Sequence, residues 1–379
     1  MKNKKRLSLY IHIPFCKQKC FYCDFPSYAR LEDLKEDYVR ALCSEIKEKA
    51  INYKIESIFI GGGTPSYLEE SEIKEILNVI NQLELEENME FTMECNPGTL
   101  TEEKLKVMLE GGVNRISMGL QAVQNSLLKE IGRIHSFKTF EENYKLARRV
   151  GFKNINVDLM FGLPNQSITE WEESLRSIAS LNPEHISAYS LIIEEGTPFY
   201  KLWEKDKLIL PNEEDEREMY SLTKEILNAY GYKQYEISNY AKDGYECYHN
   251  KVYWKCEEYL GLGSASSSFI NGERIKNIED VKTYIERINN KEDVASEIIK
   301  NSREDNIEEF VFMGLRMIEG ISLREFENKF NMSIDSLYND VIEKNIKNNL
   351  LMIEDGRLKL TDKGIELSNS VMSDFIITW

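Results

Sequence analysis

Three cysteines near the start of the chain, Cys16, Cys20 and Cys23, have a spacing that suits redox chemistry. The spacing is C-x3-C-x2-C. A cubic iron–sulfur cluster normally takes four cysteine thiolates. Three thiolates leave one iron without a protein ligand, so a small molecule can bind that iron and receive an electron. The motif therefore predicts a [4Fe–4S] cluster that is held by these three cysteines.

Two other interpretations of the three cysteines remain open at this point. The same spacing falls on one face of a helix, where the thiols would simply be buried. A helix has little room here, because the strand-like residues 7–13 precede the motif and Pro14 and Pro26 bracket it. A structural zinc site would need a further pair of ligands, and none lies close by in the sequence.

The first half of the chain alternates strand and helix patterns. The expected strands are residues 7–13, 55–60, 89–94, 113–118, 153–159 and 185–191. The expected helices are residues 33–50, 71–83, 101–109, 137–150 and 169–181. Such repetition predicts an α/β fold with a parallel sheet and right-handed crossovers. Six units cannot close an eight-stranded barrel, so we expect a partial (βα)6 barrel.

Polar and glycine residues stand where these strands end, and the ends of parallel strands meet at one rim. Strand two ends in a run of three glycines, Gly61 to Gly63, which lets the backbone approach a ligand closely, although a flexible turn is the alternative. Single polar residues are weak evidence, because each one can be a solvated strand end. Together they suit a cofactor that lies across the rim. The rim residues are Gly62, Gly63, Thr64, Glu94, Gln121, Arg133 and Asp158.

The second half of the chain has a different pattern. A helix is expected over residues 213–230, an irregular aromatic-rich stretch over 232–269, and a helix over 278–289 followed by a linker. Residues 305–379 show three helical segments, a β-hairpin around Gly356 and a last helix, which is the order of a winged-helix module. The predicted domains are therefore residues 1–290 and 305–379. Acidic residues outnumber basic ones in the tail, so we expect it to pack against protein.

Composition excludes several classes of function. The chain has 379 residues, a net charge of −17 and seven cysteines. The negative charge argues against nucleic acid as a partner. No apolar run is long enough for a transmembrane segment, and no signal peptide is evident. An odd number of cysteines suits a reducing compartment, so we expect a cytoplasmic protein.

The cysteine loop after the first strand resembles that of the radical SAM superfamily. This resemblance implies a [4Fe–4S] cluster whose open iron takes S-adenosylmethionine (SAM), an electron donor for the cluster, and reductive cleavage of SAM to a 5′-deoxyadenosyl radical. It also implies that particular residues contact SAM. By position these are Tyr10, Tyr22, Gly62, Gly63, Thr64, Glu94, Gln121, Arg133 and Asp158.

Further motifs resemble the oxygen-independent coproporphyrinogen III oxidase group of porphyrin biosynthesis over nearly the whole chain. Phe25 stands where the true oxidases have a fourth cysteine. The segment from His249 to Trp254 has the pattern H-N-x-x-Y-W, which is similar to the HemW heme chaperones. The resemblance implies that His249 binds heme. From the residues alone, a buried, hydrogen-bonded histidine in an aromatic cluster is the plainer interpretation. Ser267 stands where the family usually has another histidine.

The sequence therefore predicts a heme chaperone on a radical SAM scaffold, which binds heme and passes it to an acceptor protein. An oxygen-independent coproporphyrinogen III oxidase is the alternative, as is a radical SAM enzyme with an unrelated substrate. Phe25 and the H-N-x-x-Y-W pattern favour the chaperone.

Overall fold

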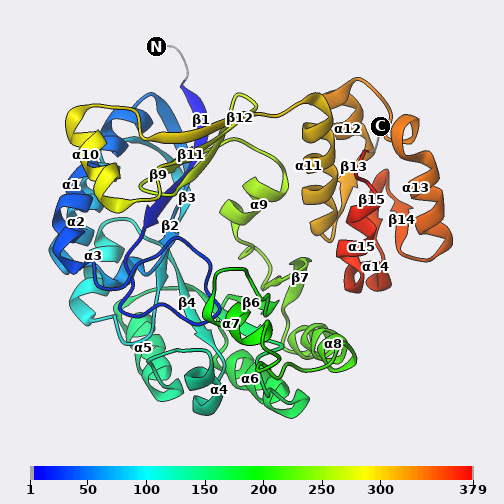
Figure 1. The fold of residues 1–379 in the computed structure, drawn as a ribbon, viewed down its shortest axis with the longest axis horizontal. Coiled ribbons are helices and arrows are strands. Elements are labelled where there is room, and N and C mark those ends of the chain that lie inside the picture. The colour runs from blue at the N-terminus through cyan, green and yellow to red at the C-terminus, as the bar shows by residue number, and fades with distance from the viewer. Residues whose placement is uncertain (1–3, 378–379) are drawn as a thin grey trace.

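The computed structural model describes residues 4–377 and contains one large mixed sheet (Figure 1). At its centre six strands lie in chain order, and each is parallel to the next. These strands are β1 (Lys5–Ile13), β2 (Tyr53–Gly62), β3 (Glu84–Cys95), β4 (Arg115–Gln121), β5 (Asn154–Phe161) and β6 (His185–Ser190). All six predicted strands are present, which confirms the predicted α/β fold.

Helices connect these strands and cover the outside of the sheet (Figure 1). Serine and threonine hydroxyls begin several of them: Thr101 accepts from Lys104 N at 3.2 Å, and Ser167 forms a capping box with Glu170. The helices are α1 (Lys35–Ala50), α2 (Glu70–Ile80), α3 (Glu102–Glu110), α4 (Asn125–Glu130), α5 (Phe137–Val150), α6 (Ile168–Leu181), α7 (Pro198–Trp203) and α8 (Glu213–Ala229). Short 3-10 turns at Glu32–Leu34 and Pro65–Tyr67 precede α1 and α2.

Residues 232–300 extend the sheet at both edges. One edge continues from β1 to β9, β10, β11 and β12, and the other continues from β6 to β8 and β7. The predicted irregular structure over 232–269 is therefore wrong: four strands of only three or four residues lie there. The elements are β7 (Lys233–Glu236), β8 (Asn239–Ala241), α9 (Tyr248–Trp254), β9 (Tyr259–Leu262), β10 (Ser267–Ile270), β11 (Glu273–Asn277), α10 (Val281–Asn290) and β12 (Ala295–Lys300).

The tail has a hydrophobic core of its own, which includes Val311, Phe326, Leu358 and Phe375. Its helices surround a small sheet of order β13-β15-β14, as a winged-helix module would. The elements are α11 (Arg303–Arg316), β13 (Ile321–Ser322), α12 (Leu323–Phe330), α13 (Asp335–Lys347), β14 (Leu351–Glu354), β15 (Arg357–Leu360), α14 (Asp362–Glu366) and α15 (Ser368–Ser373). The domain limits of 290 and 305 stay predictions; β12 falls between them and belongs to the large sheet.

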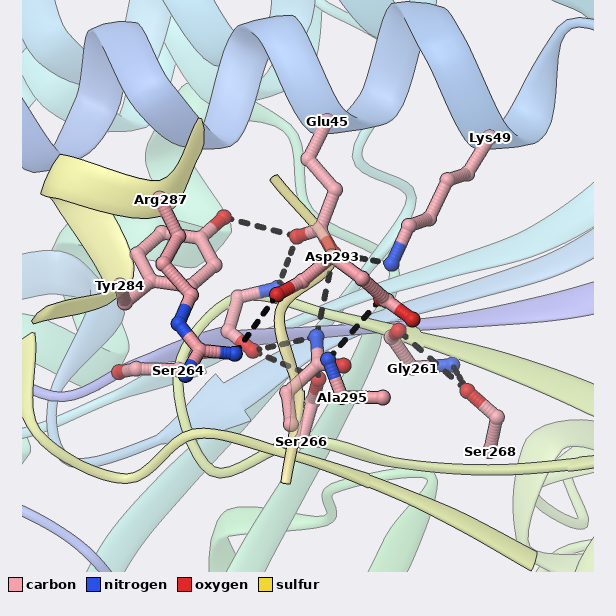
Figure 2. A network of polar contacts seen from close by, with 12 residues as sticks. Glu45, Lys49, Gly261, Ser264, Ser266, Ser268, Tyr284, Arg287, Asp293 and Ala295 are labelled. Carbon is pink, nitrogen blue, oxygen red and sulfur yellow. Dashed lines mark hydrogen bonds and ion pairs between the residues drawn. The ribbon is translucent and has the colours of Figure 1, made fainter. Parts of the chain in front are cut away.

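A buried glutamate joins the late extension to the first helix (Figure 2). Glu45 of α1 is 1% exposed and accepts hydrogen bonds from Gly263 N at 2.7 Å and Tyr284 OH at 2.7 Å. Asn277 Nδ2 donates to it at 3.1 Å, and Lys49 forms an ion pair at 2.9 Å. Four partners from β9–α10 and α1 therefore meet at one carboxylate, which fixes the extension against the barrel.

The same region reaches the strand that leads into the cysteine loop. Tyr38 of α1 donates its hydroxyl proton to His12 O at 2.7 Å and accepts from Ser264 N at 3.0 Å. The loop after β9 therefore supports the end of β1. Within residues 4–377, no helix is both long enough and apolar enough to cross a membrane.

Candidate functional site

The three cysteines lie on the irregular loop between β1 and α1, at the carboxyl end of β1. The residues from Cys16 to Ser27 contain no helix, so the alternative of three cysteines on a helix face is wrong. Backbone hydrogen bonds from Cys16 N to Tyr28 O at 3.0 Å and from Thr64 N to Phe15 O at 2.8 Å fix the loop. All seven cysteines are free.

The thiols are not grouped around one point. Among residues 4–377 no three His, Cys, Asp or Glu side chains are arranged to hold a single metal ion. Thiols that ligate one zinc ion would each lie about 2.3 Å from it, so they would be grouped closely. Thiolates that hold a cubane cluster bind different irons and can lie further apart.

One pocket at the barrel rim brings the three thiols together with most of the predicted SAM residues. Beside the cysteines it is lined by Tyr22, Gly62, Gly63, Thr64, Glu94, Gln121, Arg133 and Asp158. Tyr10 is the exception. Its hydroxyl hydrogen-bonds His12 Nδ1 at 3.0 Å, and its ring packs near Phe59 with centroids 6.4 Å apart.

The glycine run after β2 is required by packing as well as by any ligand. Gly62 has φ +107°, and a Cβ there would lie 2.5 Å from His12 Cε1. A Cβ on Gly63 would lie 2.8 Å from Phe15 O and 3.0 Å from Cys16 Sγ. The glycines therefore allow the β2 loop to lie directly against the cysteine loop, which the sequence did not reveal.

Arg133 joins the cysteine loop to the other strand ends. Its Nη1 donates to Cys20 Sγ at 3.5 Å, and its Nη2 donates to Asn96 Oδ1 at 2.9 Å and to Gly119 O. Asn96 in turn donates to Thr64 Oγ1 at 2.7 Å. Arg133 therefore places a positive charge and an N–H donor beside the sulfur of Cys20.

Burial disfavours the thiolate form of Cys16 and Cys23. It raises the pKa of Cys16 and raises the pKa of Cys23 to about 11. These thiols are therefore protonated at neutral pH unless a metal replaces the proton. Metal binding at this loop would release protons, which fits a cluster-forming loop.

Two carboxyl groups face the same pocket. Burial, followed by the nearby Asp158, raises the pKa of Glu94 to about 8, and Gly62 N donates to Glu94 Oε2 at 3.0 Å. Burial also raises the pKa of Asp158, which accepts from Asn156 at 2.6 Å and Ser117 at 3.2 Å. These acceptors can bind hydroxyl and amino groups of a polar ligand. The donor set therefore fits a cluster with an amino-acid-bearing nucleoside such as SAM.

Sequence reasoning missed three polar residues of this pocket, Asn96, Ser117 and Tyr189. Tyr189 donates to Gln121 Oε1 at 2.9 Å. Asn96 and Tyr189 lie at or near the carboxyl ends of β3 and β6, so the strand-end rule that identified Glu94 and Asp158 would also have found them. Ser117 is the third residue of β4, and the rule would not have found it.

His249 does not line this pocket. It is fully buried, its Nδ1 hydrogen-bonds Ser57 Oγ at 2.8 Å, and its Nε2 hydrogen-bonds Tyr253 OH at 2.9 Å. Its ring also stacks on Phe59 with centroids 5.4 Å apart. Both nitrogens that could bind iron are therefore occupied. This conformation is the aromatic-cluster alternative of the sequence analysis, and heme coordination by His249 stays a prediction that requires the cluster to open.

The tryptophan of the same motif contacts the tail. Arg316 of α11 lies over the Trp254 ring, 4.4 Å from its centroid, and pairs with buried Glu236 at 3.7 Å. Ile237 N donates to Arg316 O at 3.1 Å. Helix α9 therefore connects the barrel to the C-terminal module.

The two departures from the resembled pattern lie in different places. Phe25 lines the pocket and is 60% exposed. Ser267 is an exposed residue of β10 opposite Lys276 and lines none of the pockets around the cysteines. The Ser267 substitution thus leaves the rim unchanged.

Known proteins resemble the chain over its full length. The sequence model for the radical SAM superfamily matches residues 10–178, and that for the HemN C-terminal domain matches residues 301–367. The heme chaperone HemW of Bacillus subtilis is 40% identical over 374 residues, covering 97% of this chain and 99% of the relative. The HemW of Lactococcus lactis is 38% identical, covering 99% and 98%.

Among solved structures, the coproporphyrinogen III oxidase HemN of Escherichia coli matches with a TM-score of 0.86. It is 22% identical and covers 99% of this chain and 90% of that one, so it shows the fold alone. The two HemW sequences have a higher identity to this chain than HemN has, and each match covers at least 97% of both sequences. The chain therefore belongs to the HemW family of the radical SAM superfamily.

Proposed function

We propose that this protein is a heme chaperone, which binds heme and transfers it to an acceptor protein. The observation that carries the proposal is the similarity to relatives named heme chaperones, at 38–40% identity over at least 97% of this chain. Phe25 at the rim supports the same choice, because the resembled oxidases have a further cysteine there. A cytoplasmic location is part of the proposal, and seven free cysteines suit a reducing compartment.

The proposal includes a [4Fe–4S] cluster that is bound by Cys16, Cys20 and Cys23, and SAM that is bound in the pocket beside it. When bound, these groups would supply one-electron chemistry, and an external electron donor would be needed. Arg133 would hold the thiolate of Cys20, and Glu94 and Asp158 would accept hydrogen bonds from the SAM amino and hydroxyl groups. Phe25 and Tyr22 would limit access of water from the cysteine side.

Heme coordination by His249 does not support the proposal, but it can be tested by mutation. Iron coordination would cost it the hydrogen bond to Ser57 or that to Tyr253. If His249 is the heme ligand, His249→Ala removes the heme absorption band that the wild type gives. If its role is packing, His249→Ala lowers the stability, while a folded fraction still binds heme with an unchanged spectrum.

The experiment uses the full chain with its cluster reconstituted under anaerobic conditions. Hemin is added, and the Soret band is titrated to obtain the stoichiometry and Kd. In parallel, coproporphyrinogen III is supplied with SAM and a reductant. We expect saturable hemin binding and no decarboxylation. Turnover of coproporphyrinogen III would show that the protein is an oxidase. Failure to bind hemin would contradict the proposed chaperone function.

A further inference from the structure

A buried arginine with few partners lies inside the barrel, below the pocket at the rim. Arg115, the first residue of β4, is 2% exposed. Among residues 4–377 its side chain has one hydrogen bond, from Nη1 to Thr92 Oγ1 at 3.4 Å, and its Nε has no partner. A guanidinium carries five N–H donors, and a buried charge that lacks a partner is costly.

The nearby carboxylates are occupied by other donors. Glu90 of β3 accepts from Tyr248 N at 2.9 Å and from His249 N at 3.0 Å, where it holds the start of α9. Asp158 accepts from Asn156 and Ser117. Neither forms an ion pair with Arg115, although both lie near enough to raise its pKa. Most of the N–H donors of the guanidinium therefore remain available to a ligand.

Strand geometry places Arg115 at the inner end of a cavity. Alternate residues of a regular strand share a face, so Arg115, Ser117 and Gly119 lie on one face of β4, and the strand becomes irregular after Gly119. Gly119 and Gln121 line the rim pocket, Ser117 lines both, and Arg115 lines a second cavity below it. Arg115 precedes Gly119 by four residues, which correspond to about 13 Å along the strand, so Arg115 lies about that far below Gly119 at the rim.

The opening of this second cavity combines exposed apolar side chains with two acidic residues, Asp24 and Glu194. Phe25 and Ile192 line it and are 60% and 66% exposed, and Met160 and Leu191 lie beside them. Deeper inside, Asn156 and Asn250 accompany Arg115. The cavity therefore offers a guanidinium at its inner end and apolar side chains near its opening, beside four carboxyl groups. This lining suits a molecule with an apolar body and a single acidic tip that reaches Arg115.

We propose that the barrel interior binds a carboxylate of an amphipathic ligand through Arg115. A guanidinium pairs with a carboxylate in a two-point contact. The acidic residues of the lining repel any anion, and they repel a doubly charged phosphate more strongly than a singly charged carboxylate. This inference rests on the proposed function, since one source of the carboxylate is a propionate of heme. The other source is a free fatty or aromatic acid.

The test compares hemin with hemin dimethyl ester, which has the same ring without free carboxylates. Both are titrated into the full chain with its reconstituted cluster, and the Soret band gives each Kd. The wild type should bind hemin roughly tenfold or more tighter than the ester, as a charge-assisted contact in a buried site would give. Arg115→Met should reduce this preference to about twofold or less.

Two further variants make the comparison decisive. Arg176→Met removes the same charge from an exposed position on α6 and should keep the wild-type preference. Asn250→Asp places an acid of equal size in the cavity and should weaken hemin but spare the ester. Circular dichroism and iron content show whether Arg115→Met folds. If Arg115→Met does not fold, Asn250→Asp still tests whether the cavity binds the carboxylates of hemin.

The possible failures are distinguishable. Equal affinity of the wild type for hemin and its ester overturns the Arg115 inference and leaves the proposed function intact. If neither porphyrin binds, the proposed function fails, and calorimetry with decanoate then decides the inference alone. Decanoate binding that depends on Arg115 supports a carboxylate site for another acid, and its absence overturns the site.

Discussion

At the scale of single residues, the three cysteines differ from the other thiols in their surroundings. They line one pocket, whereas Cys43 is buried in the core on α1. We therefore expect Cys20→Ala to lose the cluster, because only two thiolates would remain. Iron and sulfide content after anaerobic reconstitution measures this. Cys43→Ala is the matched control and should keep a full cluster; a full cluster in Cys20→Ala would refute the assignment.

Gly63 gives a second prediction at this scale. A Cβ there would meet Phe15 O at 2.8 Å and Cys16 Sγ at 3.0 Å. Gly63→Ala should therefore lower cluster content together with SAM affinity, because the added carbon displaces the cysteine loop. Gly244→Ala lies in a turn with nothing within 4 Å of a Cβ; its φ of +83° makes the substitution itself strained, but it should leave cluster content and SAM affinity unchanged. A full cluster with only SAM affinity reduced would show that the glycine serves the ligand alone.

The residues at the rim could be predicted because they follow a simple rule. Glu94 and Asp158 are polar residues near the ends of apolar strands, and parallel strands end at one rim. Partners that depend on side-chain direction could not be predicted. Tyr10 bonds His12 instead of entering the pocket, and Gly63 packs against Cys16.

At the scale of elements, the strand–helix units are predictable and the sheet edges are not. Strands β1, β2 and β4 contain apolar runs long enough to show a pattern, and turn residues bound them. Strands β7 to β10 have three or four residues, too few for a period of two to be distinguished. Their pairing with β1 and β6 depends on distant parts of the chain.

Glu45 supplies a prediction about how the extension is held. Glu45→Ala would leave Gly263 N, Asn277 and Tyr284 without their acceptor in a buried place. We expect a loss of about 3–5 kcal/mol in the free energy of unfolding, as for other broken buried charge networks. Chemical denaturation measures this loss. Glu48→Ala, an exposed neighbour on the same helix, should change stability by less than about 0.5 kcal/mol.

Hydrogen exchange gives an independent check on the same variant. If Glu45 fixes the extension, the amides of β9 and α10 exchange faster in Glu45→Ala, while those of β4 and β5 do not. Uniform loss of protection across the sheet would contradict a local role.

At the scale of the whole molecule, buried histidines make stability depend on pH. Burial, with a contribution from Arg115, lowers the pKa of His249 to about 3, against an ordinary value near 6.5. Between about pH 3 and pH 6.5, His249 is therefore protonated in the unfolded state but not in the folded state. The contribution of His249 is complete above about pH 6.5 and decreases as the pH falls toward 3.

The corresponding prediction compares the wild type with His249→Gln, which keeps a polar side chain but cannot be protonated. Between pH 6 and pH 4 the stability of the wild type should fall more steeply, by up to about 1.4 kcal/mol per pH unit. Urea midpoints at several pH values measure the difference. Glu94, whose pKa is raised to about 8, acts in the opposite direction and cancels in this comparison. Parallel pH profiles would show that His249 is accessible to protons when folded.

The central proposal is that the whole chain carries heme and delivers it to an acceptor. The most direct measurement loads the reconstituted protein with hemin, mixes it with apomyoglobin as an acceptor, and follows the Soret band of the acceptor. If the proposal is right, the acceptor gains heme in step with its loss from this protein, and faster than from hemin bound to serum albumin. Heme that stays on this protein while the acceptor remains empty, or a protein that never takes up hemin, would contradict it.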